Sequence, residues 1–88
     1  GFPTTALIGL QTDPAAVDKV ASALAALPEV HYVAITTGTH DMFAWVALGS
    51  SEELGAFLRS KVGAIKGVRR TVTFVNLSIR KRTYGMIL

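Results

Sequence analysis

Cysteine is absent from this chain of 88 residues. Disulfide bridges, thiolate metal sites and a cysteine nucleophile are therefore excluded, and nothing in the composition indicates an oxidising compartment. No apolar run approaches the roughly 20 residues that a membrane-spanning helix needs, and the first residues lack the basic stretch of a secretory signal. We therefore expect a soluble domain without a membrane partner, and the cytoplasm as its default location.

Charged residues are scarce, at 17% of the chain, whereas hydrophobic residues make up 50%. This balance argues against disorder and favours a compact domain that buries further surface by oligomerising. The net charge of +3 comes without a dense basic face or a recognisable reading element, so we expect no direct nucleic-acid binding by this domain. The length leaves room for one small domain, and we take residues 1–88 as one unit.

Motifs for catalysis and for cofactor binding are also missing. His31 and His40 are separated by roughly 30 Å if the chain between them is extended, so they cannot share a metal ion within one subunit. No serine stands in a nucleophile-elbow setting, and no glycine-rich loop is suited to cradle a phosphate. We therefore expect no enzyme activity, no metal and no cofactor.

The most informative part of the chain is residues 30–48, with the sequence VHYVAITTGTHDMFAWVAL. Two runs rich in β-branched and aromatic residues flank a polar cluster at 36–41, which predicts an antiparallel strand pair joined by a tight loop. The loop has two interpretations. Its glycine and short polar residues suit a turn, which sequence physics alone favours. Its N–H groups, hydroxyls and carboxylate also suit the ammonium and carboxylate of an amino acid.

Two further segments predict a strand and a helix before this pair. Residues 5–11 are almost continuously apolar and predict an interior strand, in which Gly9 allows a close approach. Asp13 followed by Pro14 predicts a helix start, with the aspartate carboxylate capping free N–H groups. Apolar residues at helical spacing extend this helix to about Leu27, and Pro28 stops it.

A second helix and a last strand follow the pair. Ser50 and Glu53 have the spacing of a capping box and predict the helix start. Gly55 lies inside this helix, which is consistent with a close approach to another backbone. Residues 68–79 alternate as a long strand. The start at 1–3 is interpreted as a linker remnant of a longer protein, and the tail at 83–88 as a further strand for a neighbouring subunit.

The order strand, helix, strand, strand, helix, strand is that of a ferredoxin-like βαββαβ domain of the α+β class. Crossover handedness then places both helices on one face of a four-stranded antiparallel sheet. The other face has no cover within the chain, although both faces carry large apolar residues such as Tyr32, Phe43 and Trp45. Face-to-face packing of two sheets in a homodimer is the simplest way to cover it.

Three sequence segments resemble one known family. They are LPEVHYVAITTGTHD at 27–41, GAIKGV at 63–68 and RTVTFVNL at 70–77, and their most specific feature is a TGxxD loop followed by RTxT. The chain resembles, from about residue 4 to residue 81, the C-terminal effector domain of Lrp/AsnC regulators. This domain is also called RAM, for regulation of amino-acid metabolism.

The resemblance implies a ferredoxin-like domain that dimerises through its sheet and assembles further into tetramers or an octameric ring. It also implies an amino-acid effector bound between dimers, with Asp41 taking the ammonium group and loop N–H groups and hydroxyls taking the carboxylate. The residues that it nominates are Thr37, Gly38, Thr39, His40, Asp41, Thr71 and Thr73. Such regulators usually carry an N-terminal helix-turn-helix domain, which is absent from this chain, so DNA binding would belong to the full-length protein.

Two other functions share the predicted topology. A small dimeric ferredoxin-like enzyme of the monooxygenase or isomerase type would need a pocket lined by a base. An amino-acid-sensing domain of a metabolic enzyme would bind the same class of ligand.

Overall fold

Strands and helices alternate along the chain in the expected order. The computed structural model describes residues 3–82 and contains β1 (Thr4–Thr12), α1 (Val17–Ala25), β2 (Val30–Ile35), β3 (Met42–Leu48), α2 (Ser51–Phe57) and β4 (Val68–Val75). A 3₁₀ turn over Pro14–Ala16 precedes α1, and a π-helical turn over Leu58–Val62 continues α2.

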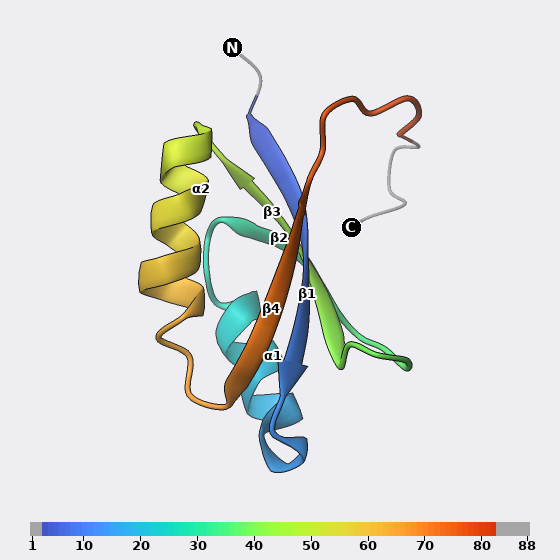
Figure 1. Cartoon of the computed structure of the whole chain (residues 1–88), viewed down its shortest axis with the longest axis vertical. Coiled ribbons are helices and arrows are strands. Elements are labelled where there is room, and N and C mark those ends of the chain that lie inside the picture. Colours follow the sequence, from blue (N-terminus) through green and yellow to red (C-terminus); the bar gives the residue numbers. More distant parts are fainter. Residues whose placement is uncertain (1–2, 83–88) are drawn as a thin grey trace.

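The four strands form one sheet in the order β2-β3-β1-β4. Every neighbouring pair is antiparallel. Both helices lie on the same side of this sheet (Figure 1). The α+β ferredoxin-like prediction is therefore confirmed, with β1 and β3 in the centre and β2 and β4 at the edges.

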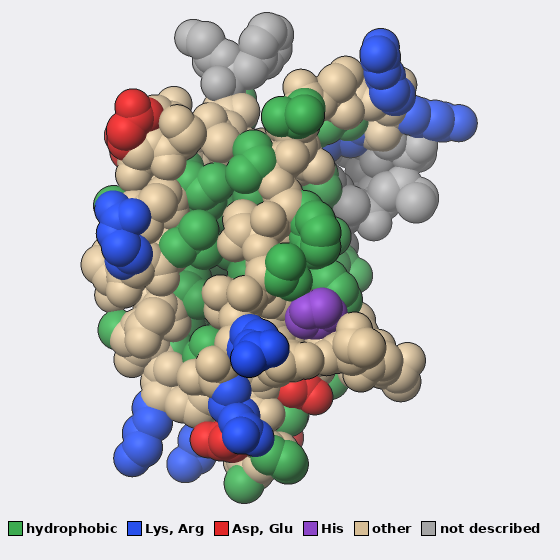
Figure 2. Space-filling view, viewed as in Figure 1, with side chains coloured by type: hydrophobic (Ala, Val, Ile, Leu, Met, Phe, Trp, Pro, Cys, Tyr) green, Lys and Arg blue, Asp and Glu red, His purple; other side chains and the backbone are tan. Residues whose placement is uncertain are grey.

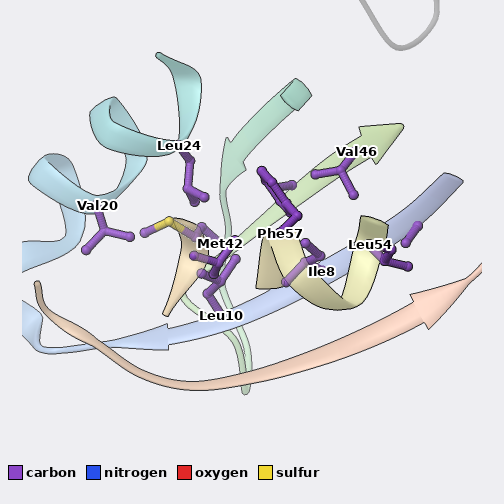
Figure 3. Close-up of a cluster of buried hydrophobic side chains, with 11 residues drawn as sticks. Ile8, Leu10, Val20, Leu24, Met42, Val46, Leu54 and Phe57 are labelled. Carbon is purple, nitrogen blue, oxygen red and sulfur yellow. The ribbon is translucent and has the colours of Figure 1, made fainter. Parts of the chain in front are cut away.

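The hydrophobic core fills the space between the sheet and the helices. Alternate residues of the two central strands face it, because successive side chains of a strand point to opposite sides. The buried cluster contains Ala6, Ile8, Leu10, Val20, Leu24, Met42, Ala44, Val46, Leu54, Phe57 and Val62. Figure 3 shows the labelled members of this cluster converging from the strands and from both helices. Strand alternation and helical spacing thus bury the same core from two sides.

The opposite side of the sheet, here called the open face, carries a row of large apolar residues. Cross-strand register aligns Tyr32 with Trp45, Trp45 with Leu7 and Leu7 with Phe74, so one residue from each strand contributes to the row. Tyr32 is 38% exposed and Phe74 is 54% exposed. The guanidinium of Arg82 lies 5.5 Å from the centroid of the Trp45 ring. No helix of the described residues covers this face, as expected from the sequence.

The start and end of α1 differ from the prediction. Asp13 makes no side-chain cap, so the expected capping role of its carboxylate is wrong. Its Oδ1 atom instead lies 3.5 Å from Nε of Arg69, at the start of β4. The helix ends at Ala25 and not at Leu27, because the Leu27 N–H closes a tighter turn on the carbonyl of Leu24. Pro28 disfavours a helical conformation for the residue before it.

One of the two hydrogen bonds of the predicted capping box at the start of α2, the one accepted by Ser50, is confirmed. The Glu53 N–H donates to Oγ of Ser50 at 3.1 Å, as expected. The Glu53 carboxylate reaches one residue further back and accepts from the Gly49 N–H at 2.8 Å. The side chains of Glu53 and Ser50 together therefore satisfy two N–H groups at the start of the helix.

Strand β4 ends at Val75, whereas the sequence predicted a strand to Ile79. Among the described residues β4 is an edge strand with β1 as its one neighbour, and the Asn76 N–H, just after β4, donates to the carbonyl of Thr5. β1 begins at Thr4, which this register places opposite Leu77, so residues 78 and 79 have no facing residue in β1. Leu77 itself is 96% exposed. The predicted strand in the tail lies outside the described residues.

Two glycines provide a matched stability test. Gly67 has φ of +104°, and a Cβ there would lie 2.6 Å from Cβ of Ala16, whereas a Cβ on Gly55 would meet only the guanidinium of Arg59. The expected close backbone approach at Gly55 is therefore wrong. We expect Gly67→Ala to lower the free energy of unfolding by about 1–3 kcal/mol and Gly55→Ala to raise it by up to about 1 kcal/mol. Urea unfolding measures both, and equal effects would contradict this difference.

Candidate functional site

The loop of residues 36–41 lies at the end of the sheet where β1 finishes and β4 begins (Figure 1). Gly38 at its tip has φ of +102°, a conformation that side-chain-bearing residues rarely adopt. The turn interpretation of this glycine is therefore confirmed. The rest of the loop makes contacts that go beyond a turn.

Asp41 connects the loop to the central strand β1 through hydrogen bonds. Its N–H donates to the carbonyl of Leu10 at 2.8 Å, and its carbonyl accepts from the N–H of Thr36 at 2.9 Å. The side-chain Oδ2 accepts from the N–H of Thr12 at 2.7 Å. Within residues 3–82 the other carboxylate oxygen, Oδ1, accepts no hydrogen bond. Asp41 is thus held in place through one oxygen while the second remains available to a ligand.

His40 lies over the open face of the sheet. Its ring packs against Phe43 with centroids 5.4 Å apart and an interplanar angle of 56°. A Cβ on Gly9 would come within 3.0 Å of the same ring, so Gly9 makes room for His40, as its expected close approach required. The hydroxyl of Thr39 lies 3.2 Å from Nδ1 of His40. These contacts hold the His40 ring against the open face.

A polar hollow of about 560 Å³ opens next to Asp41. This volume is within the range of small-molecule sites. The residues that line it are Gln11, Thr12, Thr39, Asp41, Arg69 and Arg70. Two of the lining residues are joined by a hydrogen bond, in which Nε2 of Gln11 donates to the carbonyl of Thr39 at 2.8 Å. Figure 2 shows basic and acidic side chains gathered beside a histidine at this end of the molecule.

Positively and negatively charged side chains both line this hollow, and some of them form no ion pair within the described residues. Arg69 contacts Asp13, but both side chains are more than half exposed, so the pair is weak. Arg70, which lies opposite Gln11 in the β1–β4 register, and Asp41 form no ion pair in the part of the chain that the structure describes. A cation and an anion that line one hollow without pairing suit a ligand that carries both charges.

A second hollow, of about 450 Å³, lies between α2 and the far end of β3. Its charged residues include Glu29 and Lys61, whose Oε2 and Nζ atoms are 2.5 Å apart. The hydrogen bond from Lys61 holds the pKa of Glu29 below its usual value. Because these two charges already neutralise each other, the hollow offers less to a charged ligand than the one beside Asp41. No group of three His, Asp or Glu side chains suited to a metal ion occurs within residues 3–82.

The sequence matches the Lrp/AsnC ligand binding domain over residues 5–86. The chain belongs to the Lrp/AsnC family. It is 37% identical over 87 residues to an HTH-type transcriptional regulator of Pyrococcus abyssi, a match that covers 99% of this chain and 55% of that protein. The chain thus spans about half the length of such relatives.

Two solved structures share the fold. The structure of E. coli AsnC gives a TM-score of 0.88 at 25% identity, covering 94% of this chain and 56% of that one. A transcriptional regulator of Neisseria meningitidis, solved as a complex with L-Met, gives 0.85 at 19% identity, covering 92% and 54%. The resemblance inferred from the motifs is confirmed: the chain is an Lrp/AsnC ligand binding domain, and its relatives are named as transcriptional regulators and not as enzymes.

The Lrp/AsnC fold brings only part of the nominated residues to the hollow. Thr39 and Asp41 line it, and His40 lies beside it. Thr37 and Gly38 are exposed at the loop tip and do not line it. The remaining two, Thr71 and Thr73, pair with Leu10 and Ile8, whose side chains face the core, so register places these threonines on the helix side of the sheet.

Four residues of the hollow were not nominated from the sequence. They are Gln11, Thr12, Arg69 and Arg70. The ferredoxin-like topology could have identified them, because it places β1 and β4 as antiparallel neighbours, so the end of one strand lies beside the start of the other. The arginine pair at the start of the last strand was visible in the sequence, but it resembles an ordinary solvated strand end.

Proposed function

We propose that this domain binds an amino acid in the hollow beside Asp41 and that binding modulates the assembly of the regulator. The observation that carries the proposal is the lining of one hollow by Asp41 and Arg70, opposite charges that form no ion pair with each other. An amino acid at neutral pH is a zwitterion and supplies both complementary charges. The L-Met complex of the Neisseria meningitidis regulator supports this ligand class.

The two ligand charges have separate partners in this arrangement. Asp41 Oδ1 accepts from the ammonium group, while Oδ2 keeps its bond to Thr12 and holds the carboxylate in position. Arg70 presents a planar guanidinium, which binds a carboxylate through two parallel hydrogen bonds. Loop N–H groups and hydroxyls add further donors, as the sequence analysis expected.

The open face is the proposed dimer interface. Its row of Tyr32, Trp45, Leu7 and Phe74 would be buried by the same row of a second copy. The hollow lies at the end of this face, where dimers would meet to form a tetramer or octamer. A ligand bound there makes contacts that differ between assembly states, and it therefore shifts their equilibrium.

The DNA-binding function belongs, in this proposal, to a part of the full-length regulator outside this chain. The relatives are named HTH-type regulators and are about twice as long as the matched region. This domain then senses the effector in the cytoplasm and makes no direct contact with DNA. Within residues 3–82, no helix has the length and apolar character needed to cross a bilayer.

Asp41→Asn tests the site without removing the loop anchor. The asparagine carbonyl oxygen still accepts from the Thr12 N–H, but the negative charge that binds the ligand ammonium is lost. We expect the wild-type domain to gain about 2.7 kcal/mol at an amino-acid concentration of about 100 times the Kd. The variant should lose this gain and keep its melting temperature without ligand. Thermal unfolding with a panel of amino acids measures both.

Asp18→Asn is the matched control, because Asp18 is an exposed residue of α1 and does not line the hollow. It should respond to ligand like the wild type. Undiminished binding by Asp41→Asn would show that the hollow is not the site.

A further inference from the structure

We infer that the hollow selects an amino acid with a neutral polar side chain, such as glutamine or asparagine, over apolar and acidic ones. This inference rests on the proposed function, because it specifies the ligand class of the same site. It follows from the chemistry of the lining, from the charge balance around the hollow and from the amide of Gln11.

Polar and charged side chains make up the lining that residues 3–82 of one subunit give to the hollow. Its six residues are two arginines, two threonines, an aspartate and a glutamine. The large apolar side chains of the open face belong to rows further along the sheet and do not line it. An apolar ligand side chain would find no apolar contact here and would remove water from polar groups without replacing their hydrogen bonds. The lining therefore disfavours leucine-like and methionine-like ligands.

The charges around the hollow balance when the ligand is a simple zwitterion. Arg69 is already in contact with Asp13. Arg70 is then the cation for the ligand carboxylate, and Asp41 is the anion for the ligand ammonium. A carboxylate in the ligand side chain would lie near Asp13 and Asp41, and it would have to compete with Asp13 for Arg69. The lining therefore disfavours acidic ligands as well.

Gln11 is the residue best placed to recognise a polar side chain. Its Nε2 donates to the carbonyl of Thr39, which can only accept, so the orientation of the amide is determined. The Oε1 atom accepts no hydrogen bond within residues 3–82. This oxygen can accept from the amide N–H of a ligand side chain, which neither methionine nor glutamate can supply.

Two sets of ligands with similar shape test the selectivity by calorimetry on the purified protein. The sets are glutamine, glutamate and methionine, and asparagine, aspartate and leucine. We expect the amide to bind about tenfold more tightly than the other two in at least one set, the value of one net hydrogen bond. Equal or tighter binding of the apolar or acidic members would overturn this inference and leave the proposed function intact. If no amino acid binds, the proposed function fails and this inference fails with it.

Gln11→Leu tests the recognition residue separately. The partly exposed position on β1 accepts leucine without burying a polar group. The tenfold preference of the amide over its apolar counterpart should fall to about one. Lys66→Gln, an exposed change outside the hollow, should leave the preference unchanged. An undiminished preference in Gln11→Leu, with a melting temperature that shows a folded protein, would overturn the role of Gln11.

Discussion

Phe74→Asp is expected to convert the proposed sheet-to-sheet dimer to a monomer. Phe74 is 54% exposed at the β4 end of the apolar row on the open face. In a sheet-to-sheet dimer the introduced carboxylate would be buried against apolar side chains without a partner, which costs several kcal/mol. We therefore expect the dimer Kd to rise by at least about 100-fold, since each 1.4 kcal/mol changes affinity about tenfold. Sedimentation equilibrium measures this change.

Ser60→Asp is the matched control for this experiment. It introduces the same charge at an exposed position of the π-helical turn, on the other side of the sheet from Phe74. Its dimer Kd should equal that of the wild type. A wild-type protein that stays monomeric at high concentration, or a dimer unaffected by Phe74→Asp, would refute the proposed interface.

Ile8→Ala is expected to give the largest loss of stability. Ile8 is fully buried in the centre of β1, between Ala44 of β3 and Thr73 of β4. Truncating a buried isoleucine removes apolar contacts and leaves a cavity, at a cost of about 2–5 kcal/mol. Small domains have a total stability of about 5–15 kcal/mol, so the variant should unfold at a much lower urea concentration. Equilibrium urea unfolding, followed by circular dichroism, measures the loss.

Leu7→Ala is the neighbouring control, one residue away but on the open face. Leu7 is partly exposed and packs within the row between Trp45 and Phe74. At concentrations where the protein is monomeric, its cost should be clearly smaller than that of Ile8→Ala. At higher concentrations it should weaken the dimer instead. Equal losses in the monomer would show that the two faces of β1 are not distinguished as the structure indicates.

Local patterns predicted most elements because local chemistry decides them. Runs of β-branched and aromatic residues identified the strand pair β2 and β3, and the spacing of Ser50 and Glu53 identified the start of α2. Predictions failed where a distant residue changed the local outcome. Asp13 contacts Arg69 in place of its own helix, and β4 ends at Val75, close to the point where its neighbour β1 begins.

The candidate site shows the same division. The sequence located the loop, because a glycine among short polar residues stands out between two apolar strands, and the family resemblance nominated Asp41 and Thr39 within it. It missed Gln11, Thr12 and the two arginines, which lie far from the loop along the chain, on both sides of it. These residues come close to the loop only when particular strands pair in a particular register. That register is set by contacts between residues that are distant along the chain.

The amino-acid sequence by itself determined the element order, the two-sided apolar character of the sheet and the Lrp/AsnC family, because residue type, periodicity and motif spacing are properties of the chain alone. The tertiary structure decided which side of the sheet stays open and which charges share a hollow. The loop of residues 36–41 becomes a candidate effector site only when antiparallel pairing places Arg70 and Gln11 beside Asp41. That proximity is a long-range property, because it is set by strand pairing and not by any local pattern.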